Sequence, residues 1–378
     1  MATSTTPVSL ADATNAAILA VSEDQLSGFQ VDPFGDIASR TSLSVEDVIE
    51  RVRAMLAAGT IRRVRQTVQA TRLAAGALVA WKVPGDRLDD AFNFMVHDDP
   101  FSGHVVIRST DPEAAGHDYR LWTTLKVPQG FSLHRHCEYL QARAGAESYR
   151  AMPAKRLFVL GVGHLRRRQI EPGSRAKTPA QALTTDVVQL TPRQWSVLAE
   201  LKRDFAPAEL ERDLWAGRAR LAGLSLTDFV AAARELESLG LMGRFSTFLE
   251  HVKQLSTGEL VTRYNALFHW AVPRGRELEA GREIGRHDIL THAYWREGGP
   301  EFGNVNLMAV AHGMDKDLLL RHKDAIDSHL ESIGVPVSYT NVFWGGRSEI
   351  KPSEVLPAIY ETWCASRGIA PDSMREDV

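Results

Sequence analysis

The sequence predicts an α+β protein built as a tandem repeat, in which each copy is a winged helix-turn-helix followed by a ferredoxin-like β-α-β-β-α-β domain. Three landmarks occur twice in the same order: a glycine that ends a helix, a β-prone stretch with a Trp shortly before a Pro, and a segment that runs from His to Arg. They are Gly59, Trp81 and residues 104–108 in the first copy, and Gly240, Trp270 and residues 292–296 in the second. Two copies of one unit predict two related folds within one chain.

The bulk composition is compatible with two folded copies. The chain has 378 residues, of which 44% are hydrophobic, so it is long enough to bury two cores. A formal net charge of −3 provides no general attraction to nucleic acid or to an acidic membrane surface. The two cysteines, Cys137 and Cys364, are far apart and lack metal-ligand spacing. Neither a disulfide framework nor a zinc ribbon is therefore expected.

The first part of each copy has the pattern of a winged helix. Residues 36–42 and 44–58 read as two helices, with Ser44 as the N-cap of the second and Gly59 as its stop. Residues 60–64 are β-prone and follow directly, as a wing does. The second copy repeats this order with a long helix over residues 226–240. Two winged helices are predicted.

The second part of each copy alternates strands and helices in the order of a split β-α-β sandwich. Predicted strands follow one another at matching places in the two copies; they are residues 76–83, 104–108, 119–127 and 156–162 in the first, and 266–272, 292–296, 305–312 and 339–344 in the second. Residues 170–180 are polar and rich in Pro and Gly, so they are the best candidate for a linker.

These patterns predict a sequence of domains. They are an N-terminal extension (1–29), a first winged helix-turn-helix (30–70), a first ferredoxin-like domain (71–169), a linker (170–187), a second winged helix-turn-helix (188–255), a second ferredoxin-like domain (256–352) and a C-terminal extension (353–378).

The helices at the position of DNA-reading helices carry the wrong charge for DNA. A reading face needs Lys, Arg, Asn or Gln to contact phosphates and base edges. The first candidate helix instead presents Glu46, Asp47 and Glu50, and the second presents Asp228 and Glu235. Acidic side chains on these faces would repel a duplex, so DNA is not expected as a partner.

The order of winged helix and ferredoxin-like domain resembles the Lrp/AsnC superfamily. Several motifs are more specifically similar to the siroheme decarboxylases within it: the wings at 59–63 and 240–246, the stretch Arg263-Tyr-Asn-Ala266, the segment His292-Ala-Tyr294-Trp-Arg296, and the strand Asn306-Leu-Met-Ala-Val-Ala-His312-Gly313. The resemblance covers residues from about 30 to 352 and matches the two-subunit enzyme fused into one chain. Gly243 in the second wing, Val106 in the first copy and Glu297 after Arg296 depart from the family's motifs.

The resemblance implies a carboxy-lyase that removes carboxyl groups from acetate side chains of siroheme, giving didecarboxysiroheme on a route to haem or haem d-type products. Siroheme carries eight carboxylates, and the planar fork of Arg suits such groups. Because the conjugated macrocycle can accept the electrons left by carbon dioxide, no cofactor is expected beyond the iron tetrapyrrole substrate. The candidate substrate-binding residues are Arg63, Arg120, Arg244, His251, Arg263, His312 and Lys351.

The candidate catalytic residues come from the two His-to-Arg segments. His292 is the expected proton donor, because imidazole exchanges protons near neutral pH. Arg296 is expected to hold a carboxylate and Tyr294 to orient the substrate, since alternate residues of a strand share one face. His104 and Arg108 are the matching pair in the first copy, which we expect to support the second. No metal site is expected, although His251 and His312 are candidates for an axial contact to the substrate iron.

Two other classes of function remain open from the sequence. One is a transcription regulator of the Lrp/AsnC type that senses a tetrapyrrole, and the other is a non-catalytic tetrapyrrole-binding partner. In each case we expect a cytoplasmic protein without a membrane partner, because no long apolar run and no signal peptide are visible. The two halves are expected to form an internal pseudo-dimer, and pairing of two chains into a homodimer is also compatible with the sequence.

Overall fold

The computed structural model describes residues 6–161, 166–249, 258 and 260–376. It divides the chain into two compact units that cut across the two copies. A helical unit takes its residues from Met1–Gln69, Val162–Arg168 and Val188–Arg263, and a barrel unit from Ala70–Gly161, Gln169–Val187 and Tyr264–Val378. Each copy therefore contributes its first part to the helical unit and its second part to the barrel unit.

The helical unit shows the expected order of elements in both copies. In the first, α2 (Pro33–Thr41) and α3 (Val45–Ala57) precede β2 (Ile61–Val68); in the second, α7 (Ala216–Leu221) and α8 (Leu226–Ser238) precede β7 (Met242–Leu249). The helices α1 (Ala13–Ser22) and α6 (Pro192–Lys202) complete the unit. Ser44 caps α3 by accepting a hydrogen bond from the Asp47 amide at 3.0 Å, as predicted, and Ser225 caps α8 in the same way.

The wing strands pair across the two copies. β7 lies in the middle of a three-stranded sheet, between β2 and the short β1 (Leu26–Ser27), and both pairs are antiparallel. This pairing differs from the separate wing predicted for each copy, and the designation of two winged helices remains a prediction. The predicted N-terminal extension supplies β1 and α1 to this unit.

The barrel unit contains the two β-α-β-β-α-β segments. The first consists of β3 (Ala74–Lys82), α4 (Leu88–His97), β4 (Ser102–Ser109), β5 (Leu121–Pro128), α5 (Leu133–Ala144) and β6 (Ser148–Leu160). The second consists of β8 (Tyr264–Ala271), α9 (Glu277–Ile284), β9 (Leu290–Arg296), β10 (Leu307–Gly313), α10 (Lys316–Ser332) and β11 (Tyr339–Ile350). The mixed α/β content and the predicted order of elements are confirmed.

The two four-stranded sheets join into one closed barrel, which the sequence analysis did not predict. The strands follow the order β10-β8-β11-β4-β5-β3-β6-β9, so β11 pairs with β4 and β6 pairs with β9 at the two junctions between copies. Both junctions are antiparallel, and closure leaves neither sheet with an exposed edge. Equivalent strands of the two copies, such as β3 and β8, run in the same direction along the barrel. The two copies are therefore related by a pseudo-twofold axis that lies along the barrel.

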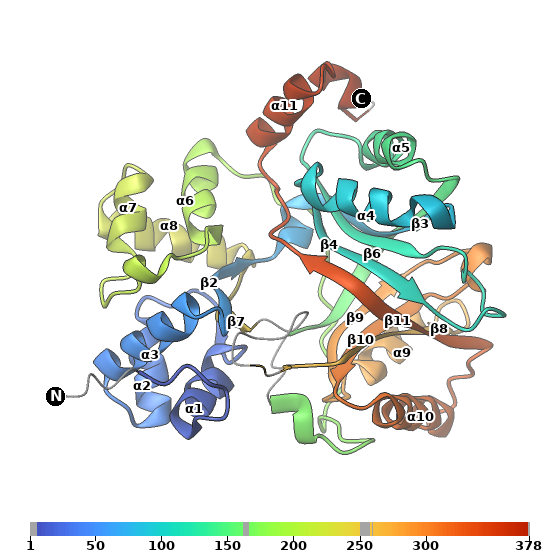
Figure 1. The fold of residues 1–378 in the computed structure, drawn as a ribbon, viewed down its shortest axis with the longest axis horizontal. Coiled ribbons are helices and arrows are strands. Elements are labelled where there is room, and N and C mark those ends of the chain that lie inside the picture. Colours follow the sequence, from blue (N-terminus) through green and yellow to red (C-terminus); the bar gives the residue numbers. More distant parts are fainter. Residues whose placement is uncertain (1–5, 162–165, 250–257, 259, 377–378) are drawn as a thin grey trace. The chain divides into compact units, whose positions relative to one another are not determined.

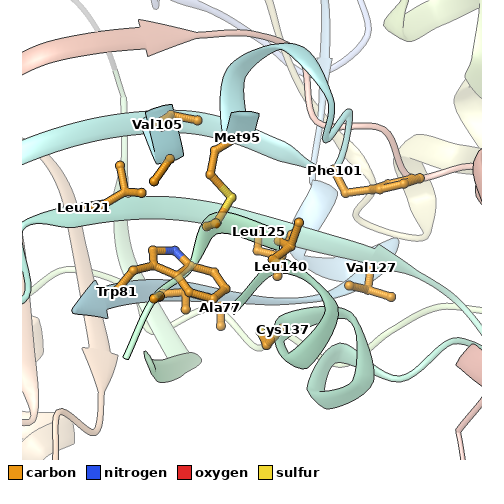
Figure 2. Close-up of a cluster of buried hydrophobic side chains, with 14 of the residues drawn as sticks. Ala77, Trp81, Met95, Phe101, Val105, Leu121, Leu125, Val127, Cys137 and Leu140 are labelled. Atoms are coloured by element: carbon orange, nitrogen blue, oxygen red, sulfur yellow. The ribbon is translucent and has the colours of Figure 1, made fainter. Parts of the chain in front are cut away.

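Each sheet has a separate core on its outer face, beneath its own helices. In Figure 1, α4 and α5 lie on one side of the barrel strands, and α9 and α10 on the other. The core of the first copy includes Trp81, Val105 and Leu121 from the strands and Met95 from α4, as Figure 2 shows. The matching core of the second copy includes Phe268, Trp270 and Ala293.

A third core fills part of the barrel interior and draws side chains from both copies. Its buried members include Trp122 and Met152 from the first copy and Leu267, Phe302 and Phe343 from the second. Because successive strand residues point to opposite faces, the neighbours of these residues at even spacing also face inward. The inner face of β9 thus carries His292, Tyr294 and Arg296, since Ala293 belongs to the outer core.

The two segments expected to be peripheral pack into the barrel unit. In the predicted linker 170–187, the amides of Ala176 and Ala180 donate to the carbonyls of Arg286 and Arg282, at 2.9 and 3.0 Å. In the C-terminal extension, α11 (Pro357–Ser366) places the Tyr360 hydroxyl 2.9 Å from Nδ1 of the buried His136. Both segments are therefore ordered parts of this unit.

His269 lies in the barrel interior and predicts an acid sensitivity of the fold. Its side chain is fully buried, and burial, reinforced by the charge of Arg108, lowers its pKa to about 3. Below the ordinary pKa of about 6.5 the unfolded chain binds a proton that the folded chain does not, so stability is lost as the pH falls. We expect this side chain alone to cost about 2 kcal/mol of unfolding free energy at pH 5.

The measurement is urea unfolding of the wild type and of His269→Leu between pH 7 and pH 5. The variant should lose less stability over this range than the wild type. His117→Leu is the control, because His117 is exposed. Equal pH dependence in His269→Leu and the wild type would show that His269 is not held neutral by burial.

Candidate functional site at the polar end of the barrel

One end of the barrel interior is polar, and basic side chains of both copies meet there. It is the end at which β4 and β9 begin and at which β5 and β10 finish. His104 on β4 and Lys126 on β5 come from the first copy, and His292 on β9 and His312 on β10 from the second. We call these four residues the polar end. All four are partly exposed, whereas the apolar residues deeper in the barrel are buried.

The strand register shows that these four residues form two pairs, each related by the pseudo-twofold axis. His104 lies opposite Thr124, and His292 lies opposite Val310, so the two histidines occupy matching positions. Two residues further along β5 and β10, Lys126 and His312 occupy matching positions as well. Equivalent residues of the two sequence copies therefore lie at the same end of the barrel.

Arg108 and Arg296 form a third matching pair, deeper in the barrel wall at the junctions between copies. Arg108 lies opposite Gly345 of β11, and Arg296 lies opposite Ala154 of β6. Each guanidinium donates to a carbonyl of the other copy: Arg108 to Phe343 at 3.4 Å, and Arg296 to Met152 at 2.5 Å. These contacts bind the two sheets together where the barrel closes.

Both arginines are desolvated. Arg108 is 4% exposed, and burial lowers its pKa to about 9. Arg296 is 7% exposed, its pKa is also lowered by burial, and its guanidinium lies 4.4 Å from the centre of the Tyr294 ring. Burial raises the pKa of Tyr294, so this phenol stays protonated. The wall of the barrel thus carries fixed positive charge close to the polar end.

A chain of hydrogen bonds joins Arg108 to His292. Arg108 Nη1 donates to Asn265 Oδ1 at 3.2 Å, which leaves the Asn265 amide nitrogen to donate to His312 Nε2 at 3.0 Å. Nδ1 of His312 then carries the hydrogen and donates to the Thr291 hydroxyl oxygen at 3.3 Å. Arg108 comes from the first copy and the other residues from the second, so this arrangement belongs to both copies.

The same chain sets the tautomer of His292. The Thr291 hydroxyl donates to the Val310 carbonyl at 3.1 Å, so it has only acceptor capacity left for Nδ1 of His292, 3.1 Å away. With this arrangement, neutral His292 holds its hydrogen on Nδ1, and Nε2 is its basic nitrogen. Thr291 is able to serve both histidines because it sits at a bulge between β9 and β10.

If the chain decarboxylates siroheme, as the sequence resemblance implies, Asn265→Ala is expected to lower the rate of that reaction about tenfold, which corresponds to roughly the free energy of one hydrogen bond. The substitution removes the amide that orients His312, and through Thr291 it loosens the tautomer of His292. The pH profile of that reaction should shift, whereas the affinity for siroheme should change little. Asn93→Ala is the control, because Asn93 is exposed on α4. A loss confined to affinity would contradict the positioning role of Asn265.

The remaining predicted residues lie elsewhere. Arg120 is exposed just before β5, at the opposite end of that strand from Lys126. Lys351 donates to three carbonyls at the C-terminal end of α4, those of Met95, Val96 and Asp99. This contact gives Lys351 a structural role as a helix cap, and its substrate-binding role remains a prediction.

Three of the predicted arginines belong to the helical unit. Arg63 on β2 forms an ion pair with Asp204 at 3.3 Å. Arg244 on β7 donates to the Glu23 carbonyl at 3.2 Å, and burial lowers its pKa. Arg263 is exposed immediately before β8. His251 lies outside the described residues.

Lys126 is the residue of the polar end that the sequence analysis did not single out. It occupies the place of His312 under the pseudo-twofold axis, but this equivalence depends on the pairing of β5 with β4. Asn265 appeared within a motif without a role of its own. A signal for both existed in the alignment of the two copies, once their strands are placed in register.

The part of the barrel formed by the first copy is similar to a known domain family. Residues 73–158 match the family described as the AsnC-like ligand binding domain. The fold matches the crystal structure of the siroheme decarboxylase NirDL with a TM-score of 0.64 at 18% identity, over 94% of this chain and 99% of that one. A second crystal structure, of NirDL in complex with an iron-uroporphyrin III analogue, matches with a TM-score of 0.63.

Curated relatives narrow the class. The chain is 30% identical over 131 residues to the siroheme decarboxylase alpha subunit of Desulfovibrio desulfuricans, covering 34% of this chain and 70% of that subunit. It is 25% identical over 291 residues to the siroheme decarboxylase of Hydrogenobacter thermophilus, covering 76% and 79%. The chain belongs to the siroheme decarboxylase family of the Lrp/AsnC superfamily. The predicted enzyme class, a carboxy-lyase, is confirmed.

The structure adds one finding on membranes. In the parts of the chain that it describes, no helix has both the length and the apolar character required to cross a bilayer.

Proposed function

We propose that this chain decarboxylates acetate side chains of siroheme and gives didecarboxysiroheme, on a route to haem or haem d-type products. The observation that carries the proposal is the charge of the barrel interior. Arg108, Arg296 and Lys126 face inward with the three histidines of the polar end. Among the described residues, no carboxylate forms an ion pair with any of these three cations. A ligand with many carboxylates would supply the missing negative charge.

The polar end also fits the chemistry of the step. An eight-stranded barrel encloses its own side chains or at most one small ligand, and the deeper interior of this barrel is packed with apolar residues. The proposal therefore places one acetate-bearing edge of the macrocycle at the polar end, with the ring outside the barrel. Buried cations nearby stabilise the bound carboxylate through their field, and Arg108 and Arg296 act from within the wall.

Proton delivery completes the reaction. When the bond between the methylene carbon and the carboxyl group breaks, carbon dioxide leaves and the electron pair stays on the methylene carbon, conjugated with the macrocycle. We assign His292 as the donor: the bond between Nε2 and its proton breaks as the new C–H bond forms, and the neutral imidazole recovers a proton from water. Each acetate lost thus consumes one proton, and no cofactor beyond the tetrapyrrole is required by this scheme.

Mass analysis of the tetrapyrrole tests the proposal. The purified protein is incubated with siroheme without oxygen, and the tetrapyrrole is extracted over time. We expect successive losses of the mass of carbon dioxide, ending at two per siroheme. Siroheme that is bound but keeps its mass would contradict the proposal and would favour the non-catalytic binding partner.

A further inference from the structure

Lys126 stands at the place in the first copy that His312 holds in the second. It lies on the inner face of β5, two residues beyond Thr124, which is opposite His104. In each copy a basic side chain therefore lies two residues beyond the residue that is opposite the histidine. It is Lys126 in the first copy and the imidazole of His312 in the second. The inference developed from this difference rests on the decarboxylase function proposed above.

The surroundings of Lys126 differ from those of His312 at one matched position. In the second copy, the Asn265 side chain lies between His312 and Arg108 and is hydrogen-bonded to both. The strand register places Gly76 of β3 at the matching position in the first copy. A Cβ atom on Gly76 would lie 2.6 Å from both Cδ and Nζ of Lys126. The ammonium group thus occupies the space that an amide side chain fills in the second copy.

This packing leaves Lys126 under the influence of the charge of Arg296, without a neutralising carboxylate beside it. Arg296, on β9, is the charged group that acts on it, and His104 is the titratable group on the neighbouring strand β4. Within the described residues, no carboxylate oxygen lies within 4.0 Å of Lys126 Nζ. The lysine is nevertheless partly exposed, so a ligand at the polar end is able to reach it.

We propose that Lys126 is a second proton donor at the polar end, serving one of the two decarboxylations while His292 serves the other. As carbon dioxide leaves, an N–H bond of the Lys126 ammonium breaks and a C–H bond forms on the methylene carbon. The neutral amine then takes a proton from water. The two donors stand in the same barrel end, one from each copy, and are suited to two acetates of one macrocycle.

The protonation equilibrium of Lys126 fits this role. Burial, together with the charge of Arg296, lowers its pKa to about 7. An ordinary lysine, with a pKa of about 10.4, would give up a proton much less readily at neutral pH. The guanidinium of an arginine in the same place would keep its proton. Comparing Lys126 with an arginine at the same position therefore distinguishes a proton donor from a residue that only binds a carboxylate.

The first experiment is independent of turnover. The intact protein is labelled with a trace of an amine-reactive reagent between pH 5 and pH 10, and labelled peptides are quantified by mass spectrometry. We expect the rate at Lys126 to have its midpoint near pH 7, well below that of Lys155, which is exposed and paired with Glu297. A midpoint for Lys126 equal to that of Lys155 would overturn the proposal.

The second experiment uses Lys126→Arg, with Lys155→Arg as the control. Lys126→Arg should bind iron uroporphyrin III as the wild type does, but it should accumulate siroheme that has lost one carbon dioxide, with the other loss slowed about 100-fold or more. Lys126→Met should show the same arrest, with weaker binding. Loss of both carbon dioxide molecules from Lys126→Arg at the wild-type rate would overturn the proposal.

The outcomes distinguish this proposal from the function on which it rests. If the wild type releases no carbon dioxide from siroheme, the decarboxylase function fails, and with it the role of Lys126 in that reaction. If the wild type releases two and Lys126→Arg also releases two at full rate, only the role of Lys126 fails. Thermal unfolding of each variant establishes that the arrest is not a loss of the fold.

Discussion

His292→Gln is expected to lower turnover of siroheme by about 10² to 10⁴-fold, the usual contribution of a positioned proton donor. Glutamine approximates the size of imidazole and keeps a polar group beside Thr291, but it cannot deliver a proton. Affinity for iron uroporphyrin III should change little, because the anionic ligand is held mainly by the surrounding cations. The measurement pairs single-turnover mass analysis with a binding titration.

His104→Gln is the matched control, because the two histidines are related by the pseudo-twofold axis. Nε2 of His104 lies 2.7 Å from the Ser348 hydroxyl, so this imidazole has its own partner on β11. We expect the smaller effect in His104→Gln. A larger loss of turnover in His104→Gln than in His292→Gln would reverse the assignment of the donor.

Trp122→Ala is expected to cost about 3–5 kcal/mol of unfolding free energy, the usual range for removing a large aromatic side chain from a core. Trp122 is fully buried in the barrel interior, where its ring centre lies 5.4 Å from Phe302 and 5.1 Å from Phe343. Its indole nitrogen donates to the Tyr119 carbonyl at 2.7 Å. The ring contacts with Phe302 and Phe343 join the two copies through the middle of the barrel.

Chemical denaturation with urea measures the loss, and Trp344→Ala is the control. Trp344 is only half-buried and packs at the edge of the outer core of the second copy. It should lose clearly less stability than Trp122→Ala. Equal losses would show that the shared interior core contributes no more to stability than this peripheral contact.

Local patterns in the sequence were sufficient to predict the helices and strands of each copy. Ser44 and Gly59 fix the ends of α3 through capping and a positive φ of 79°, and both effects act within a few residues. Alternation along the segments 104–108 and 292–296 placed His and Arg on one face of each strand. These features depend on neighbours in the chain and are therefore visible without tertiary structure.

Closure of the barrel was not visible because it depends on pairing between strands far apart in the chain. The sequences of β6 and β11 taken alone do not indicate that each strand pairs with a strand of the other copy. The same limit applies to function: Arg108 reaches Asn265, and Arg296 affects Lys126, only because the junctions bring the copies together. The sequence suggested a working half and a supporting half, whereas the structure places both halves at one polar end.

A crystal structure of the protein with iron uroporphyrin III would show where the macrocycle binds, because this ligand has carboxylates like those of siroheme. We expect acetate groups of the macrocycle to lie within hydrogen-bonding distance of His292 Nε2 and Lys126 Nζ at the polar end of the barrel. A macrocycle bound with no carboxylate at these two atoms would contradict this expectation.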